Sequence, residues 1–173
     1  MDATVISPTE LDVASLVLRL ALGPMLILHG LNKVRGGLVG TASWFESLGL
    51  KPGWLHARVA AATEIGAGVI VTLGLLNGLG AMAFVGLMTV AALTDHRGKG
   101  YFIFKGGAEY VILVGIVSVA LAVVGPGRWS LDHALGLDLA GLGWGVIALV
   151  GGLVAAAGLL ATSYRPGATK ADA

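Results

Sequence analysis

Ionisable side chains inside long apolar segments are the residues of this sequence that could do chemistry. Arg19 and Glu64 lie deep within two such segments, and a helical rise of about 1.5 Å per residue puts them at similar depth. The planar guanidinium of Arg19 matches a carboxylate and has the reach to meet it. We therefore predict an Arg19–Glu64 ion pair, which would serve either as a ligand or proton site or only to lock two helices together.

A second group of ionisable residues lies nearer one end of these segments. His29 and Lys33 are four residues apart, so a helix places them on one face. Glu109 begins a later apolar segment at the same predicted depth, which predicts a His29–Glu109 or a Lys33–Glu109 contact. Histidine exchanges protons near neutral pH, so His29 is a candidate for proton transfer, although a hydrogen-bonded interior histidine is the simpler interpretation.

The remaining chemistry-bearing residues do not form a recognisable motif. His56, His96 and the adjacent Asp95 are predicted on one side and His133 on the other, with no spacing typical of a metal site such as HExxH. We therefore predict no metal centre. The absence of cysteine excludes disulfides and thiolate ligands within this chain.

Composition explains why these charges stand out. Hydrophobic residues make up 56% of the 173 residues and charged residues only 12%, whereas a soluble domain carries about 25% charge. The mean hydropathy is +0.88, so we expect an integral membrane protein whose surface contacts a lipid bilayer. A net charge of +1 without a Lys/Arg run argues against a nucleic-acid partner.

Five apolar segments approach the length of about 20 residues that crosses a bilayer core of about 30 Å as a helix. They predict an all-α membrane fold and run approximately over residues 13–31, 54–76, 78–94, 106–124 and 139–163. No basic residue precedes the first segment, so we interpret it as a retained helix and not as a signal peptide. Residues 41–48 form either a short helix in the membrane interface or an ordinary loop.

The distribution of basic residues predicts the orientation. If all five segments cross, one side of the membrane carries a single basic residue, Arg128, and the other side carries eight: Lys33, Arg35, Lys51, Arg97, Lys99, Lys105, Arg165 and Lys170. Short loops rich in Lys and Arg stay in the cytoplasm. The sequence therefore predicts an external amino terminus and a cytoplasmic carboxyl terminus.

Several stretches in this order resemble the DoxX family of small bacterial membrane proteins. They are LRLALGPMLILHGLNKV (18–34), GTASWFESLGL (40–50), AATEIGAGVIVTLGLLNGLGA (61–81), KGGAEYVIL (105–113) and GPGRWSLD (125–132). The resemblance implies a transmembrane four-helix bundle within residues 1–132, located in the bacterial cytoplasmic (inner) membrane. The remaining part, residues 133–173, would add a fifth transmembrane helix and a short cytoplasmic tail, which departs from the family pattern.

The resemblance also directs the functional hypotheses. Some DoxX proteins are linked to sulfur oxidation as the small subunit of a thiosulfate:quinone oxidoreductase, and others resemble membrane scaffolds for oxidative-stress proteins. Our first hypothesis is thus a membrane subunit or scaffold of a redox assembly with soluble or membrane partners, and a homo-oligomer is also compatible. The alternatives are a quinone-linked oxidoreductase subunit acting through His29 and Glu109, and a small-solute or proton pathway through Arg19 and Glu64. No cofactor is evident from the residues, and a quinone is the candidate.

Overall fold

The computed structural model describes residues 6–167, which form helices and no strand beyond one isolated bridge between Leu50 and Tyr164. The predicted all-α class is therefore confirmed for this part of the chain. Its helices are α1 (Pro8–Arg35), α2 (Leu38–Ser47), α3 (Gly53–Leu73), α4 (Asn77–Leu93), the 3-10 helix η1 (Ile103–Lys105), α5 (Glu109–Val124), α6 (Leu131–Ala134) and α7 (Leu142–Ser163).

The five long helices α1, α3, α4, α5 and α7 fall on the five predicted apolar segments. Helix α1 begins earlier than the apolar run because Ser7 and Glu10 form a capping box, in which each side chain bonds the other's backbone N–H. Helix α2 confirms the short helix expected near residues 41–48 over the alternative loop. Glu46 of α2 accepts a hydrogen bond of 3.1 Å from the backbone N–H of Gly53, and this bond ties α2 to the start of α3.

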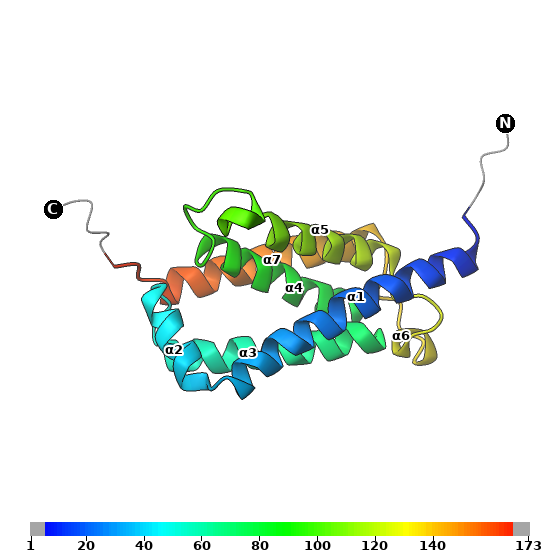
Figure 1. Cartoon of the computed structure of the whole chain (residues 1–173). Helices are drawn as coiled ribbons and strands as arrows, with labels where there is room; N and C mark the ends of the chain where they lie inside the picture. Colours follow the sequence, from blue (N-terminus) through cyan, green and yellow to red (C-terminus); the bar gives the residue numbers. More distant parts are fainter. Residues whose placement is uncertain (1–5, 168–173) are drawn as a thin grey trace.

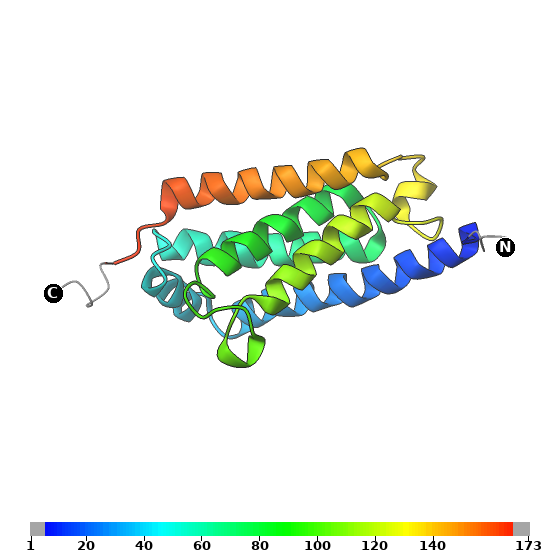
Figure 2. The same cartoon turned by 90° about the horizontal axis from the view of Figure 1, so that it is seen from above.

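The helices form two groups that meet along the middle of the molecule. Helices α1 and α3 run antiparallel with α2 at one end, and α4 packs against both α5 and α7. Helix α7, which the sequence placed outside the four-helix core, covers the face made by α4 and α5 (Figure 2). The first and last described residues lie at opposite ends of this arrangement (Figure 1).

Glycines bring α1 and α3 into close contact. A Cβ atom added at Gly68 would lie 2.7 Å from the carbonyl oxygen of Gly23, and one added at Gly23 would lie 2.7 Å from the carbonyl oxygen of Gly68. Farther along, a Cβ at Gly30 would lie 2.9 Å from the carbonyl oxygen of Ala61. Small residues are the usual means of close helix approach in membranes, and here they determine which residues of α1 and α3 face each other.

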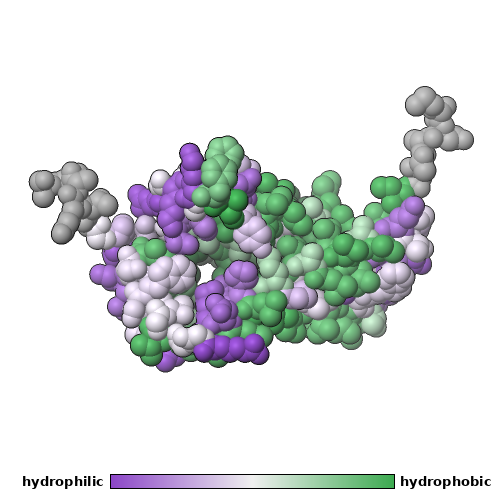
Figure 3. Space-filling view, in the orientation of Figure 1, coloured by the Kyte–Doolittle hydropathy of each residue, from purple (hydrophilic) through white to green (hydrophobic). Residues whose placement is uncertain are grey.

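The outside of the molecule is strongly apolar. Helices α1 and α7 are each long and apolar enough to cross a membrane, and α4 and α5 are shorter apolar helices. Leu142, Val146, Val150 and Val154 form an exposed stripe along α7 at helical spacing. Figure 3 shows apolar side chains over much of the molecule, with hydrophilic ones gathered mainly around α2 and the loop before α5. Contiguous apolar surface of this kind suits contact with lipid.

The close contact of α1 and α3 predicts that alanine substitutions at two glycines of α3 differ in their effect on stability. Gly68→Ala places a methyl group against the α1 backbone, so we expect the free energy of unfolding in detergent to fall by about 1–3 kcal/mol. Gly66→Ala is the matched control, because nothing lies within 4 Å of the added Cβ. Equal thermal stability of the two variants would contradict the close α1–α3 contact.

Candidate functional site

Arg19 lies in a buried site, but its partners are not the ones predicted. The side chain is only 3% exposed and does not meet Glu64, so the predicted Arg19–Glu64 pair is wrong. Its guanidinium instead donates hydrogen bonds to four backbone carbonyls, those of Val71 (3.3 Å), Thr72 (3.0 Å), Pro126 (2.6 Å) and Trp129 (2.9 Å).

The register of α1 against α3 explains this correction. Gly23 faces Gly68 and Gly30 faces Ala61, so Arg19 lies opposite the end of α3, where Gly74 is its neighbour. The last carbonyls of a helix lack partners within the helix and carry partial negative charge, and a guanidinium satisfies them. Depth estimated from the edges of apolar segments missed this, because such edges do not specify which residues of two helices face each other.

Two carboxylates, those of Asp132 and Asp12, lie at the same end of the molecule as Arg19. Asp132 is fully buried and accepts hydrogen bonds from the backbone N–H groups of Leu76 (2.6 Å) and Asn77 (2.9 Å) at the start of α4. Asp12 accepts from the backbone N–H of Arg128 at 2.7 Å and pairs with its side chain. Together with Arg19 they hold the 125–132 loop against α1, α3 and α4, which is a structural role.

Glu64 finds its partner in Lys33. The Nζ atom of Lys33 donates to both carboxylate oxygens of Glu64, at 2.6 and 2.7 Å, and the two side chains are only 15% and 11% exposed. Lys33 lies one turn beyond Gly30, whose missing side chain lets α1 approach the Cβ of Glu64. The same register that separates Arg19 from Glu64 therefore creates the Lys33–Glu64 pair.

The predicted contacts of Glu109 do not form. Its carboxylate accepts a hydrogen bond of 3.0 Å from the backbone N–H of Ile103, so it holds the loop around η1 and meets neither His29 nor Lys33. His29 Nδ1 lies 2.9 Å from the carbonyl oxygen of Met25, which assigns the proton to Nδ1 and leaves Nε2 available. The reason for the error is that α1 and α5 diverge toward this end (Figure 1).

A cavity of about 640 Å³ lies where the two helix groups separate. It is bordered by α1, α2, α3, α4, α5 and α7, and small residues create much of its space: Ala60, Ala83, Gly86, Ala91, Ala155 and Ala156. Its wall is mainly apolar, but it includes both members of the Lys33–Glu64 pair and His29. Three of the five residues predicted as a polar site thus come together here, and Arg19 and Glu109 do not.

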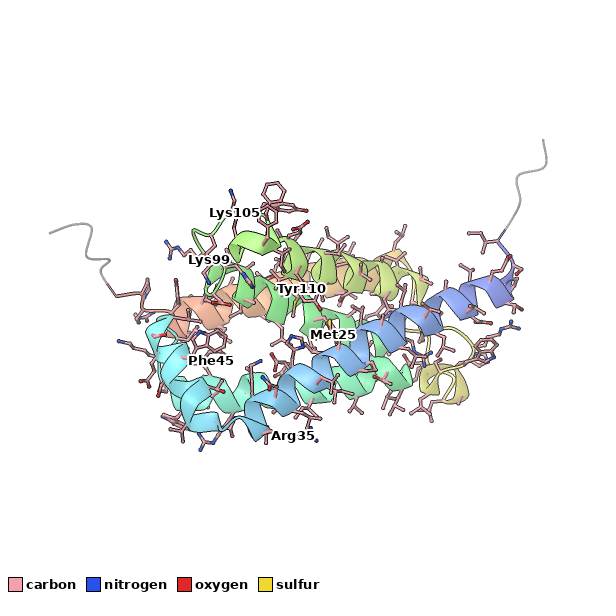
Figure 4. All side chains as sticks on the ribbon, in the orientation of Figure 1. Met25, Arg35, Phe45, Lys99, Lys105 and Tyr110 are labelled. Carbon is pink, nitrogen blue, oxygen red and sulfur yellow. The ribbon has the colours of Figure 1, made fainter. Side chains whose placement is uncertain are left out.

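The cavity opens between α1 and α5. His29 and Tyr110 line the cavity and are also exposed, so they mark its mouth. The Tyr110 hydroxyl contacts the sulfur of Met25 across this mouth, as Figure 4 shows for the two labelled side chains.

Two histidines that the sequence treated only as poor metal ligands belong to the same cavity. His56 and His96 both line it, and His56 is only 7% exposed. Residues 56, 60, 63 and 64 follow helical spacing, which places His56 on the same face of α3 as Glu64. This spacing is the signal in the sequence that could have found His56.

Comparison with known proteins identifies the family. Residues 14–97 match the family model DoxX. The chain is 34% identical over 121 residues to "Putative oxidoreductase CatD" of Bacillus subtilis, covering 70% of this chain and 86% of that protein. The chain belongs to the DoxX family. This DoxX protein is also 30% identical over 129 residues to the inner membrane protein YphA of Escherichia coli, covering 70% of this chain and 89% of YphA.

The family match covers most of the cavity wall contributed by α1 to α4, including His29, Lys33, His56 and Glu64. It does not reach α5 or α7, which close the cavity from the other side. No solved structure matches the DoxX chain. The family resemblance inferred from the sequence is confirmed, and the membrane character expected from composition has the support of the family and of the apolar exterior.

The Lys33–Glu64 pair of this DoxX protein should show energetic coupling. Lys33→Met leaves a carboxylate on an apolar wall and Glu64→Gln leaves an ammonium there, so we expect each to lower the free energy of unfolding by about 1–3 kcal/mol. The double variant should lose clearly less than the sum of the single losses. The exposed Asp95–Lys99 pair is the control, with expected coupling below about 0.5 kcal/mol. Strictly additive losses for Lys33 and Glu64 in thermal unfolding would argue against their pairing.

Proposed function

We propose that this DoxX protein is the membrane subunit of a redox assembly and that it binds the head group of a lipid-soluble quinone. The observation that carries the proposal is the cavity of about 640 Å³ with the Lys33–Glu64 pair in its apolar wall. Its volume is within the range of about 300–1,000 Å³ common for small-molecule sites. Its mouth between α1 and α5 suits a ligand that arrives through the lipid phase.

The wall chemistry fits such a head group. A quinone is a flat apolar ring with carbonyl oxygens that accept hydrogen bonds, and it carries an apolar tail. The Lys33 ammonium can donate to a carbonyl oxygen, while Met25, Leu26 and Phe45 provide apolar contact for the ring. The tail would leave through the mouth beside Tyr110.

The same residues can handle protons. Reduction of a quinone adds a proton at each oxygen, and acid–base groups within hydrogen-bond reach assist such transfers. In the cavity wall, the Lys33 ammonium donates hydrogen bonds to the Glu64 carboxylate. Nδ1 of His29 donates a hydrogen bond to the Met25 carbonyl, so Nε2 is the nitrogen that would give or take a proton. These groups replace the His29–Glu109 site expected from the sequence, because Glu109 holds the η1 loop.

Electrons would come from a partner protein in the assembly. This chain contains no cysteine, so any thiol or sulfur chemistry belongs to that partner. The name of one relative describes an oxidoreductase and that of the other an inner membrane protein, which supports both a redox role and a location in the bacterial cytoplasmic membrane. The basic end of the molecule, with Arg97, Lys99 and Lys105, is the surface on which a soluble partner would dock.

We further propose that α1, α3, α4, α5 and α7 all cross the bilayer, with the amino terminus outside. Helices α4 and α5 have 17 and 16 residues and are about 25 Å long, so their flanking loops would complete the crossing. The end with Asp12, Asp132 and Arg128 would be external, and the end with Lys33 and Lys99 cytoplasmic. The quinone cavity then lies in the cytoplasmic half of the membrane.

A pathway through Arg19 and Glu64 has less support. Each of the three guanidinium nitrogens of Arg19 donates to a backbone carbonyl, and the tight α1–α3 contact separates this residue from the cavity. A mobile ion or solute would have to break these bonds to pass. The quinone-binding subunit is therefore the function that the geometry favours.

Single cysteines test the orientation, because the natural chain has none. In intact spheroplasts, a membrane-impermeant maleimide should label Leu135→Cys, which is exposed in the loop after α6. Lys99→Cys should react only after the membrane is opened, because its loop would face the cytoplasm. Labelling of Lys99→Cys from outside, with Leu135→Cys protected, would reverse the proposed orientation.

Tryptophan fluorescence tests quinone binding. Trp44 borders the cavity, so a variant that keeps only this tryptophan should show saturable quenching when a short-tailed ubiquinone analogue is added in nanodiscs. Lys33→Met combined with Glu64→Gln should weaken the apparent affinity about tenfold or more, because the polar contacts to the carbonyl are lost.

The matched control keeps only Trp129, which lies at the opposite end of the molecule and outside this cavity. Quinone dissolved in lipid quenches both reporters without saturation. Equal, unsaturable quenching of the Trp44 and Trp129 reporters would therefore refute quinone binding in the cavity.

A further inference from the structure

Four consecutive apolar side chains are exposed in the loop that contains η1. Tyr101, Phe102, Ile103 and Phe104 are each exposed by half or more, and Phe104 by 77%. The rings of Phe102 and Phe104 stack with their centroids 5.3 Å apart, and these four residues form a compact apolar projection. Figure 3 shows an apolar patch here among hydrophilic side chains. Exposed apolar groups gathered in this way mark a surface that contacts something other than water.

Hydrogen bonds hold the apolar projection in its conformation. The Glu109 carboxylate accepts from the backbone N–H of Ile103 at 3.0 Å, and the backbone N–H of Glu109 donates to the carbonyl of Tyr101 at 2.8 Å. Nδ1 of His96 lies 2.7 Å from the carbonyl oxygen of Gly106. Because these contacts close the loop, its apolar side chains are presented outward with little further loss of backbone entropy on binding.

The position of the apolar projection indicates what it contacts. It directly precedes α5 and points sideways from the bundle, not beyond its end (Figures 1 and 2). Helix α5 has 16 residues and is about 25 Å long, which is shorter than an apolar bilayer core of about 30 Å. Residues that flank a short helix can compensate for such a mismatch. A soluble protein that approaches along the bundle axis would not face a projection that points sideways.

Basic residues flank the apolar projection in the sequence. Lys99 precedes it and Lys105 follows it, and both lie on the side of the molecule opposite Arg35 (Figure 4). Nζ of Lys99 is 3.2 Å from Asp95, but an ammonium has three donors, so Lys99 can keep this contact and also bind a phosphate. Lysines beside membrane-facing apolar side chains suit the anionic head groups of phospholipids.

We propose that the apolar projection inserts into the cytoplasmic leaflet, where Lys99 and Lys105 bind the phosphates of anionic phospholipids. This inference rests on the proposed crossing of α5 and not on quinone binding. Phe102 and Phe104 would lie where the acyl chains begin, and the lysine stems would extend outward to the phosphates. Apolar contact holds the loop in the leaflet, while the charges select anionic over zwitterionic lipid. A soluble partner would then meet Arg97 at a surface bordered by lipid head groups.

Depth-dependent fluorescence quenching tests the insertion. Because the natural chain has no cysteine, Phe104→Cys can be labelled with bimane and placed in nanodiscs of phosphatidylglycerol and phosphatidylcholine. We expect strong quenching by lipid that is spin-labelled near the head group, and little quenching by aqueous iodide. Ile116→Cys, exposed near the middle of α5, is the reference and should be quenched best by lipid that is spin-labelled deep in the acyl chain.

Lipids that carry the same spin label on different head groups test the selection of charge. Quenching of the Phe104→Cys label by spin-labelled phosphatidylglycerol should exceed quenching by spin-labelled phosphatidylcholine about two- to fivefold, because lysines near the surface attract anionic lipid. Lys99→Gln with Lys105→Gln should bring this ratio close to unity. Arg35→Gln with Lys51→Gln is the matched control, because it removes the same charge away from the η1 loop and should leave the ratio unchanged.

The possible failures of these experiments can be told apart. If iodide but no lipid quenches the Phe104→Cys label while the Ile116→Cys label responds to deep lipid, insertion is refuted and the apolar projection faces water. Equal quenching by the two head groups with both lysines present would refute anionic phospholipid as the ligand. If lipid does not quench the Ile116→Cys label, the proposed crossing of α5 fails first. None of these readouts involves quinone, so the Trp44 experiment reports separately on the proposed function.

Discussion

The contact between α1 and α3 is the constraint on which the rest of the structure depends. Gly23 and Gly68 let the two backbones touch, and this contact allows only one register. With that register, Arg19 falls at the end of α3 and Lys33 falls beside Glu64. A shift by one helical turn would separate both from their partners and leave buried charges without compensation, which membranes tolerate poorly.

The two ends of the molecule use their charges differently. At the Arg19 end, the guanidinium, Asp132 and Asp12 are bound by backbone groups and by Arg128, so their charges hold loops and helix ends in place. At the cavity end, the helix groups separate, small residues leave space, and His56 has an unpaired nitrogen. Charges bound by backbone groups stabilise one end of the protein, while the Lys33–Glu64 pair at the other end borders open space that a ligand could fill.

Much of the fold could be read from the sequence, and less of the site. Apolar length predicted the long helices, because that signal is local, while the sequence leaves residues 41–48 open between a short helix and a loop. The candidate site was harder, since it depends on which residues of two helices lie opposite each other. Hydropathy marks where a segment is apolar, whereas the Gly23–Gly68 and Gly30–Ala61 contacts set the register of α1 against α3.

By itself the sequence determined the all-α class, the family, the segregation of basic residues and the set of ionisable residues that needed partners. Only the tertiary structure decided how they pair: Lys33 with Glu64, Arg19 with backbone carbonyls, and Glu109 with the η1 loop. The reason is that composition and spacing act within one segment, whereas pairing depends on helix register and divergence. Close glycine contacts set the helix register. The divergence of the helices opens the cavity that His56 borders.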